Sequence, residues 1–367
     1  MGEAAATKAA ALPGGRTLGR VCRVGTVAAR LLRKAETAVY WLVLAPLAAC
    51  LPASLAYRVA CWRGDLAWRY QRSETACNMR RVLGNEFGPE QADRLAREHF
   101  RMQSCEAIDV MRLRGRGRSL RKLVDIRGRE HLDAALARGK GVILCAAHFG
   151  SYDSAFSLLH ASGFPLTTIG RSFHMYSDYL LGLASVQRQF WKLVYGRRLL
   201  RHRQGPNIEP WPGRIQVAVQ AAVALRANEV VTISSDAAPL DADLPRTVEM
   251  PFLGRQARLL PGVVTLARLT SAPVLTIFIY RLADYRHQVL EISPPVLMQG
   301  ETTTAFVPCV AAMDAAIRTS PAHWEYWSNT GYLAALGLLP AAPPTGTADV
   351  SPQPSVGESA ALLEHGA

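Results

Sequence analysis

Residues 141–153 have the sequence Gly-Val-Ile-Leu-Cys-Ala-Ala-His-Phe-Gly-Ser-Tyr-Asp. The unbroken apolar run in this segment is typical of a strand that is buried on both faces of a sheet. Gly150 permits a sharp turn after the strand, Ser151 can cap a helix, and Asp153 falls in the first turn of that helix. The segment therefore predicts a strand–turn–helix unit, from which layered α/β domains are built.

Short apolar runs alternate with helical patterns in the rest of the chain. Strands are expected at 142–146, 166–169, 230–234, 274–279 and 289–292. Helices are expected at 131–138, 151–162, 177–190, 214–227, 261–270 and 306–319, after a helical region at 65–121. This order predicts an α/β fold with a central, mostly parallel or mixed sheet that is flanked by helices.

The composition excludes several classes of protein and indicates an anionic partner. Of the 367 residues, 49% are hydrophobic, which excludes a chain that is disordered as a whole. Lys and Arg number 42 against 29 Asp and Glu, so the net charge is 42 − 29 = +13. Such an excess of positive charge favours a phosphate-bearing partner, either a nucleic acid or an anionic membrane surface.

The cysteine spacing and the absence of several sequence motifs argue against further kinds of site. The seven cysteines are irregularly spaced and contain no C-x-x-C pair, which argues against structural zinc and against a disulfide framework. A reducing compartment with thiols as small apolar residues is the simpler interpretation. The chain contains no P-loop, no G-x-G-x-x-G and no G-x-S-x-G sequence. We therefore expect no metal and no resident cofactor.

The N-terminal region has the pattern of a membrane anchor. Residues 1–37 are basic, and the nineteen residues from Ala38 to Ala56 carry no charge. Pro46 and Pro52 interrupt this run, and both of its flanks are basic, so a single span does not satisfy the positive-inside rule. We expect a kinked hydrophobic element at 38–62 that inserts from the cytoplasmic side. A secretory signal and a buried core helix are the two alternatives.

His148 is the candidate catalytic residue, because it follows the predicted strand at its carboxyl edge, where sites form in open α/β sheets. A turn at Gly150 would allow the Asp153 carboxylate to accept the Nδ1 proton of His148. The Nε2 atom of His148 would then act as a general base. The alternative is a histidine that pairs with Asp153 for stability alone.

Four further residues are candidates for substrate binding. Arg171 follows the strand expected at 166–169, and its guanidinium could hold a phosphate, although an ordinary surface arginine is the alternative. Asp236 closes the strand expected at 230–234 and could organise the acceptor or the arginine, or simply cap a helix. Arg255 and Arg258 are further phosphate candidates.

In combination, several segments resemble one known family over residues 46–327. The order of these segments is what carries the resemblance. They are the hydrophobic element, Asn78, Arg127-Gly-Arg-Glu-His-Leu132, Gly139-Lys-Gly141, His148 to Asp153, Asp236, Pro251-Phe-Leu-Gly254, Gly262, Ala272-Pro-Val274, Pro321, Trp324 and Trp327. The chain resembles the lipid A late acyltransferases, a family that includes the phosphatidylinositol mannoside acyltransferases and lies in the lysophospholipid acyltransferase-like superfamily.

The resemblance implies a membrane-associated bacterial enzyme of lipid biosynthesis. It would move a fatty acyl chain from an acyl carrier protein or coenzyme A thioester to a hydroxyl of a glycolipid, with His148 and Asp153 as the HX4D motif. A thioester is already activated, so a histidine base is sufficient and no covalent nucleophile is needed. Residues 63–339 would form the acyltransferase domain, and the Pro- and Ala-rich residues 340–367 a disordered tail.

The acceptor and the donor are left open. Lipid A enzymes usually carry Glu at the position of Asp153 and Gln at that of Ala237, and they carry basic residues after the second tryptophan. A phospholipid, an ornithine- or glycan-type lipid and a mannolipid are therefore all possible acceptors. The basic clusters at 112–122 and 197–203 suit an anionic membrane surface or an acidic acyl carrier protein, with a solvated loop as the alternative. We expect the catalytic domain on the cytoplasmic face of the bacterial inner membrane.

Three other functions are alternatives to acyl transfer. A nucleic-acid-binding protein is suggested by charge alone, and the chain lacks the motifs of such proteins. A non-catalytic lipid-binding relative would not need His148 and Asp153. A hydrolase would use the same histidine base with water in place of the acceptor hydroxyl.

Overall fold

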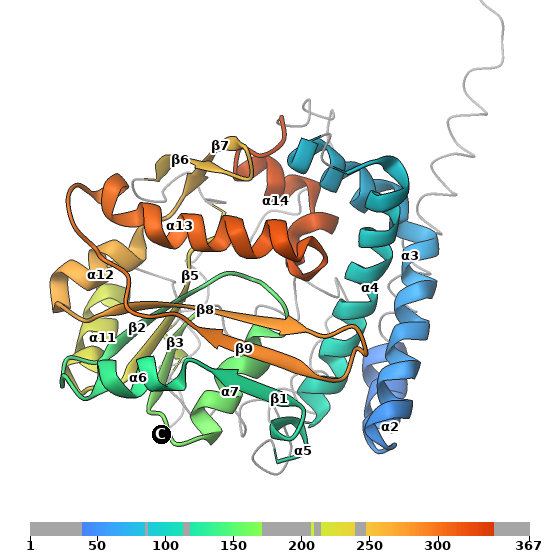
Figure 1. Cartoon of the computed structure of the whole chain (residues 1–367), viewed down its shortest axis with the longest axis horizontal. Helices are drawn as coiled ribbons and strands as arrows, with labels where there is room; N and C mark the ends of the chain where they lie inside the picture. The colour runs from blue at the N-terminus through green and yellow to red at the C-terminus, as the bar shows by residue number, and fades with distance from the viewer. Residues whose placement is uncertain are drawn as a thin grey trace, which may run out of the picture.

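A computed structural model describes residues 39–84, 87–112, 118–170, 207–208, 214–238 and 247–340 (Figure 1). The described residues form a mixed α/β fold around a seven-stranded sheet with the order β1-β9-β8-β2-β5-β3-β4. Neighbouring strands run parallel, except for the antiparallel pair β8 and β9. The strands are β1 Val124–Arg127, β2 Val142–Ala146, β3 Leu166–Ile169, β4 Asn207–Ile208, β5 Val230–Ser234, β8 Val274–Arg281 and β9 Gln288–Ile292. The predicted fold class and its central sheet are confirmed.

The register of the central strands positions the site. All five residues of β2 are buried, as the sequence predicts for a strand between two layers of helices. Ala146 of β2 lies opposite Ser234 of β5 in the parallel ladder. The chain segments that follow these two strands therefore leave the sheet side by side, at its carboxyl edge.

Helices cover both faces of the sheet (Figure 1). One face packs against α6 (Arg129–Leu136) and α7 (Tyr152–Ala161), where Leu144 of β2 lies in the shared core. The other packs against α11 (Arg214–Arg226), α12 (Gly262–Thr270) and α13 (Thr302–Thr319), where Cys145 of β2 points. The alternation of these two side chains is what the pleat of a strand requires. The expected helix at 177–190 lies outside the described residues.

The N-terminal part is a helical layer beside the sheet (Figure 1). Its elements are η1 (Tyr40–Leu44), α2 (Ala45–Ala49), α3 (Ala53–Leu83), α4 (Pro89–Arg112) and α5 (Arg118–Arg121). The helical region predicted at 65–121 is confirmed. The expected hydrophobic element divides at Pro52, whose extended ψ of 145° separates α2 from α3. Within the described ranges, we find no helix with both the length and the apolar character that a membrane span requires.

A C-terminal segment returns to the carboxyl edge of the sheet. It consists of η4 (Pro321–His323), η5 (Glu325–Ser328) and α14 (Thr330–Ala335). A two-stranded hairpin of β6 (Val248–Phe252) and β7 (Arg255–Leu259) packs beside it, and Phe252 contacts the ring of Trp324. The strand pattern predicted neither this hairpin nor β1, because their alternating exposed residues interrupt the apolar runs.

Candidate active site

The backbone of His148 is fixed from two sides. Its N–H donates to Oδ2 of Asp236 at 2.9 Å, and its carbonyl oxygen accepts from the N–H of Glu325 at 2.9 Å. The imidazole side chain is 17% exposed, so a ligand in solvent can reach it although most of the ring is covered. His148 therefore lies at the carboxyl edge of β2, as the sequence predicts.

The turn after His148 requires glycine. Gly150 has φ +59°, and a Cβ at this position would lie 2.1 Å from the carbonyl oxygen of Ile279. The N–H of Gly150 donates to the carbonyl oxygen of His323 at 2.8 Å. A side chain at residue 150 would push this turn away from β8, so the turn into α7 depends on glycine.

Asp236 is the partner of the His148 imidazole. Its Oδ1 lies 2.7 Å from Nδ1 of His148, and its side chain is fully buried. Its Oδ2 accepts from the His148 N–H and from Nε1 of Trp324, each at 2.9 Å. A buried carboxylate that accepts from Nδ1 holds the proton on that atom, which makes Nε2 the basic nitrogen of the ring.

This geometry corrects the assignment of the Nδ1 partner. The spacing predicted Asp153, whereas the carboxylate that lies against Nδ1 in the described residues is that of Asp236. Asp153 does lie in the first turn of α7, but its side chain falls outside the described residues, so its catalytic role stays a prediction. The parallel register of β2 and β5 brings Asp236 to His148, and a local motif does not contain that information.

Two tyrosine rings pack against the imidazole of His148. The ring centroids of Tyr152 and Tyr326 lie 5.0 and 4.9 Å from that of His148. Tyr326 stacks on Tyr332 at 3.7 Å, and burial raises the pKa of both phenols. These tyrosines therefore stay neutral and shield one side of the His148–Asp236 pair from water.

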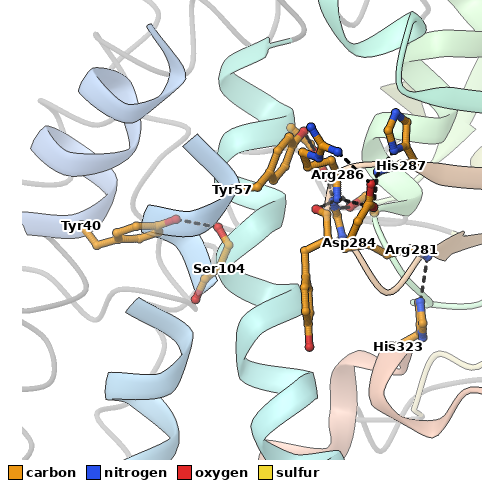
Figure 2. Close-up of polar contacts among 11 residues, drawn as sticks. Tyr40, Tyr57, Ser104, Arg281, Asp284, Arg286, His287 and His323 are labelled. Carbon is orange, nitrogen blue, oxygen red and sulfur yellow. Dashed lines mark hydrogen bonds and ion pairs between the residues drawn. The ribbon is translucent and has the colours of Figure 1, made fainter. Parts of the chain in front are cut away.

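A buried ionic cluster holds the turn between His148 and α7 through Ser151. Arg281 of β8 donates to the carboxylate of Asp109 in α4 and, at 2.7 Å, to Oγ of Ser151. The Ser151 and Tyr57 hydroxyls each donate to the same carboxylate at 2.6 Å. The backbone N–H of Arg281 also donates to Nε2 of His323 at 2.8 Å (Figure 2). The cluster ties the start of α7 to α3 and α4.

Two of the other predicted binding residues make their hydrogen bonds away from His148. The guanidinium of Arg255 donates to the carbonyl oxygen of Arg81, and that of Arg258 donates to the carbonyl oxygen of Ala335. Both contacts lie at helix C-termini, where cations are stabilising. Arg171 lies outside the described residues. In the parts of the chain that the structure describes, no group of three or more His, Cys, Asp or Glu residues is arranged to hold a metal ion.

Comparison with known proteins identifies the family. Residues 27–328 match the bacterial lipid A biosynthesis acyltransferases, and this range includes His148, Asp236 and Trp324. The chain belongs to the bacterial lipid A biosynthesis acyltransferase family. The resemblance drawn from the order of motifs is thereby confirmed.

One curated member of the lipid A biosynthesis acyltransferase family gives a measure of the divergence. The lipid A biosynthesis acyltransferase of Haemophilus influenzae is 24% identical over 182 residues, which make up 50% of this chain and 51% of that relative. The chain thus matches about half the length of this relative.

Proposed function

We propose that this protein transfers a fatty acyl group from a carrier thioester to a hydroxyl of a membrane lipid, with His148 as general base. The observation that carries the proposal is the buried Asp236 carboxylate on Nδ1 of His148. Membership of the acyltransferase family supports the reaction class. The donor is an acyl carrier protein or coenzyme A thioester, and the acceptor is a glycolipid or phospholipid.

The proposed reaction is a direct transfer. Nε2 of His148 takes the proton of the acceptor hydroxyl while the hydroxyl oxygen attacks the thioester carbonyl carbon. The new C–O ester bond forms, the C–S bond breaks, and the leaving thiolate takes the proton back from the imidazolium. Asp236 stabilises the imidazolium, and general-base assistance of this kind contributes on the order of 10²–10⁴-fold. Asp153 is proposed as a second carboxylate of the site, because it begins α7 next to this turn.

The proposed contact with the membrane is the outer face of η1, α2 and α3. Exposed apolar side chains recur there every four residues, and an exposed tryptophan follows. They are Val39, Val43, Leu47, Leu51, Leu55 and Trp62. Arg58 is exposed in the same stretch, and a cation next to apolar side chains suits an anionic lipid surface. We place this face on the cytoplasmic side of the bacterial inner membrane.

Lipid mass spectrometry on cells tests the proposal. Cells that express the wild type or His148→Ala, at matched protein levels in the membrane fraction, are compared for lipids that gain one acyl mass. Such a species in wild-type cells alone supports the transferase and identifies its acceptor. The rate of acyl transfer is then measured with purified protein, a thioester donor and that lipid. Loss of the thioester without an acylated lipid would instead indicate a hydrolase.

A further inference from the structure

Two cysteines lie between the packed helices α3 and α4. The two helices run antiparallel, and pairs of side chains meet at steps of four residues. Tyr57 donates to Asp109 at 2.6 Å, and Arg101 donates to Asp65 at 2.6 Å. The pair between these two is Cys61 with Cys105, which pack together and are close enough for each thiol to shift the pKa of the other.

The backbones of α3 and α4 touch one turn from this thiol pair. A Cβ built on Gly64 would lie 2.5 Å from the Cα atom of Arg101. Helices this close bring facing residues into the range of Cα separations that a disulfide requires, about 4.4–6.8 Å.

The two thiols differ in access and in charge environment. Cys61 lines a cavity of about 560 Å³ together with Tyr57, Arg101 and Tyr285, whereas Cys105 is fully buried. Figure 2 shows Tyr57 beside the β8–β9 turn, and Asp284 and Arg286 of that turn also line the cavity. The neighbouring Cys105 thiol lowers the pKa of the Cys61 thiol, and the charges of Arg101 and Arg281 lower it further. Burial raises the pKa of Cys105, which therefore stays protonated.

We propose that Cys61 and Cys105 form a redox-active pair, in which a peroxide that enters the cavity oxidises Cys61 and Cys105 then closes a disulfide between α3 and α4. The Cys61 thiolate attacks one oxygen of hydrogen peroxide, which breaks the O–O bond and gives a sulfenic acid and hydroxide. The Cys105 sulfur then attacks the Cys61 sulfur, and its proton leaves with the hydroxyl as water. Hydrogen peroxide is reduced and the two thiols are oxidised. The proposal does not depend on acyl transfer.

The chain contains matched controls for this chemistry. Cys145 and Cys309 are also neighbours, but both are buried in the main core and neither lines the cavity. Cys77 is an exposed thiol on the same helix as Cys61. Cys145 and Cys309 test whether proximity of two thiols is sufficient for disulfide formation. Cys77 tests whether exposure of a thiol is sufficient for its oxidation.

Peptide mapping after limited oxidation tests the proposal. The folded full-length chain in detergent is treated with hydrogen peroxide, alkylated and digested without reductant. We expect a Cys61–Cys105 linked peptide that dithiothreitol reverses, while Cys145 and Cys309 stay reduced. In Cys105→Ser we expect dimedone to trap Cys61 as its sulfenic acid. Linkage of Cys145 to Cys309 at the same rate, or oxidised Cys77 without any linked Cys61–Cys105 peptide, would overturn the proposal.

A second measurement on the wild type does not depend on the folding of any variant. At neutral pH, iodoacetamide is expected to alkylate Cys61 about 3-fold or more faster than Cys77, because the thiolate is the reactive form. A Cys61 rate at or below that of Cys77 would contradict the proposal.

Discussion

Oδ1 of Asp236 lies 2.7 Å from Nδ1 of His148, although the two residues are 88 positions apart in the chain. The sheet explains this proximity, because Ala146 of β2 and Ser234 of β5 are partners in a parallel ladder. His148 and Asp236 each follow their strand by two residues, so the ladder delivers both side chains to one point on the carboxyl edge. The catalytic pair that we propose is thus a product of strand register.

Trp324 is expected to hold Asp236 in place. In Trp324→Phe the ring is kept and the N–H that bonds Oδ2 is lost, so the proposed acyl transfer should slow by about 10-fold, the rate equivalent of roughly one hydrogen bond to a charged group. The control is Trp327→Phe, which also loses an indole hydrogen bond in the core, here to the carbonyl oxygen of Pro321. The rates are measured as release of thiol from the donor. Equal rates in the two variants would exclude this role.

Removal of the buried charge at residue 281 is expected to destabilise the fold. In Arg281→Met the Asp109 carboxylate is left buried without its cation, which should lower the free energy of unfolding by about 3–5 kcal/mol. Arg286→Met is the matched control, because its ion pair with Asp284 is over one-third exposed, and it should change stability by less than about 1 kcal/mol. Urea unfolding of both variants measures the difference. Similar midpoints would show that the buried cluster adds no stability.

Two buried histidines are expected to make the fold sensitive to mild acid. Burial lowers the pKa of His99 and of His323 to about 4, from 6.5 for an exposed histidine. The unfolded chain therefore binds more protons than the folded chain between pH 6.5 and 4. The free energy of unfolding should fall as the pH falls through this window, by about 1.4 kcal/mol per pH unit for each histidine.

Unfolding midpoints at a series of pH values check this prediction. His99→Gln keeps a donor for the Ala322 carbonyl and cannot titrate, so its slope in this window should be about half that of the wild type. Protonation of His323 would also break its bond from the Arg281 N–H, next to the turn at Gly150. An unchanged slope in His99→Gln would mean that other groups cause the acid sensitivity.

The exposed leucines of α2 and α3 are expected to bind lipid. Leu47→Glu combined with Leu55→Glu should reduce binding to vesicles that contain phosphatidylglycerol by about 10-fold or more, since each leucine contributes roughly 1.5–3 kcal/mol when buried. Leu297→Glu is the control, because Leu297 is 72% exposed and lies outside this stretch. Flotation of vesicles with bound protein measures the effect. Equal binding by both variants would assign the membrane contact to another part of the chain.

A strand could be predicted where its apolar sequence reflects burial on both faces of the sheet. The run that became β2 is apolar because helices cover both faces of the sheet, and the predicted bounds of β2, β3 and β5 matched. β1 could not be predicted in this way, because every second residue in it is exposed and its burial pattern interrupts the apolar run.

The sequence identifies His148 as a catalytic candidate but not the residues that contact it. The strand end and the glycine turn mark His148 in a single sequence, because both are local features. Asp236, Trp324 and Asp109 converge on this region through strand register, a returning C-terminal segment and a helix packed beside the sheet. Such long-range contacts have no local signature, so Asp236 was recognised as a candidate with a different role.

The rate of acyl transfer by Asp236→Asn tests the central claim most directly. Purified wild type, His148→Ala, Asp236→Asn and Asp284→Asn are supplied with one thioester donor and the acceptor lipid. Asp284 contacts Nδ1 of His287 at 2.5 Å in a second, exposed His–Asp pair, so its amide variant controls for the substitution itself. We predict that Asp236→Asn falls by about 10²–10⁴-fold, close to His148→Ala, while Asp284→Asn keeps the wild-type rate. A rate for Asp236→Asn within a few-fold of the wild type, with His148→Ala inactive, would contradict the account.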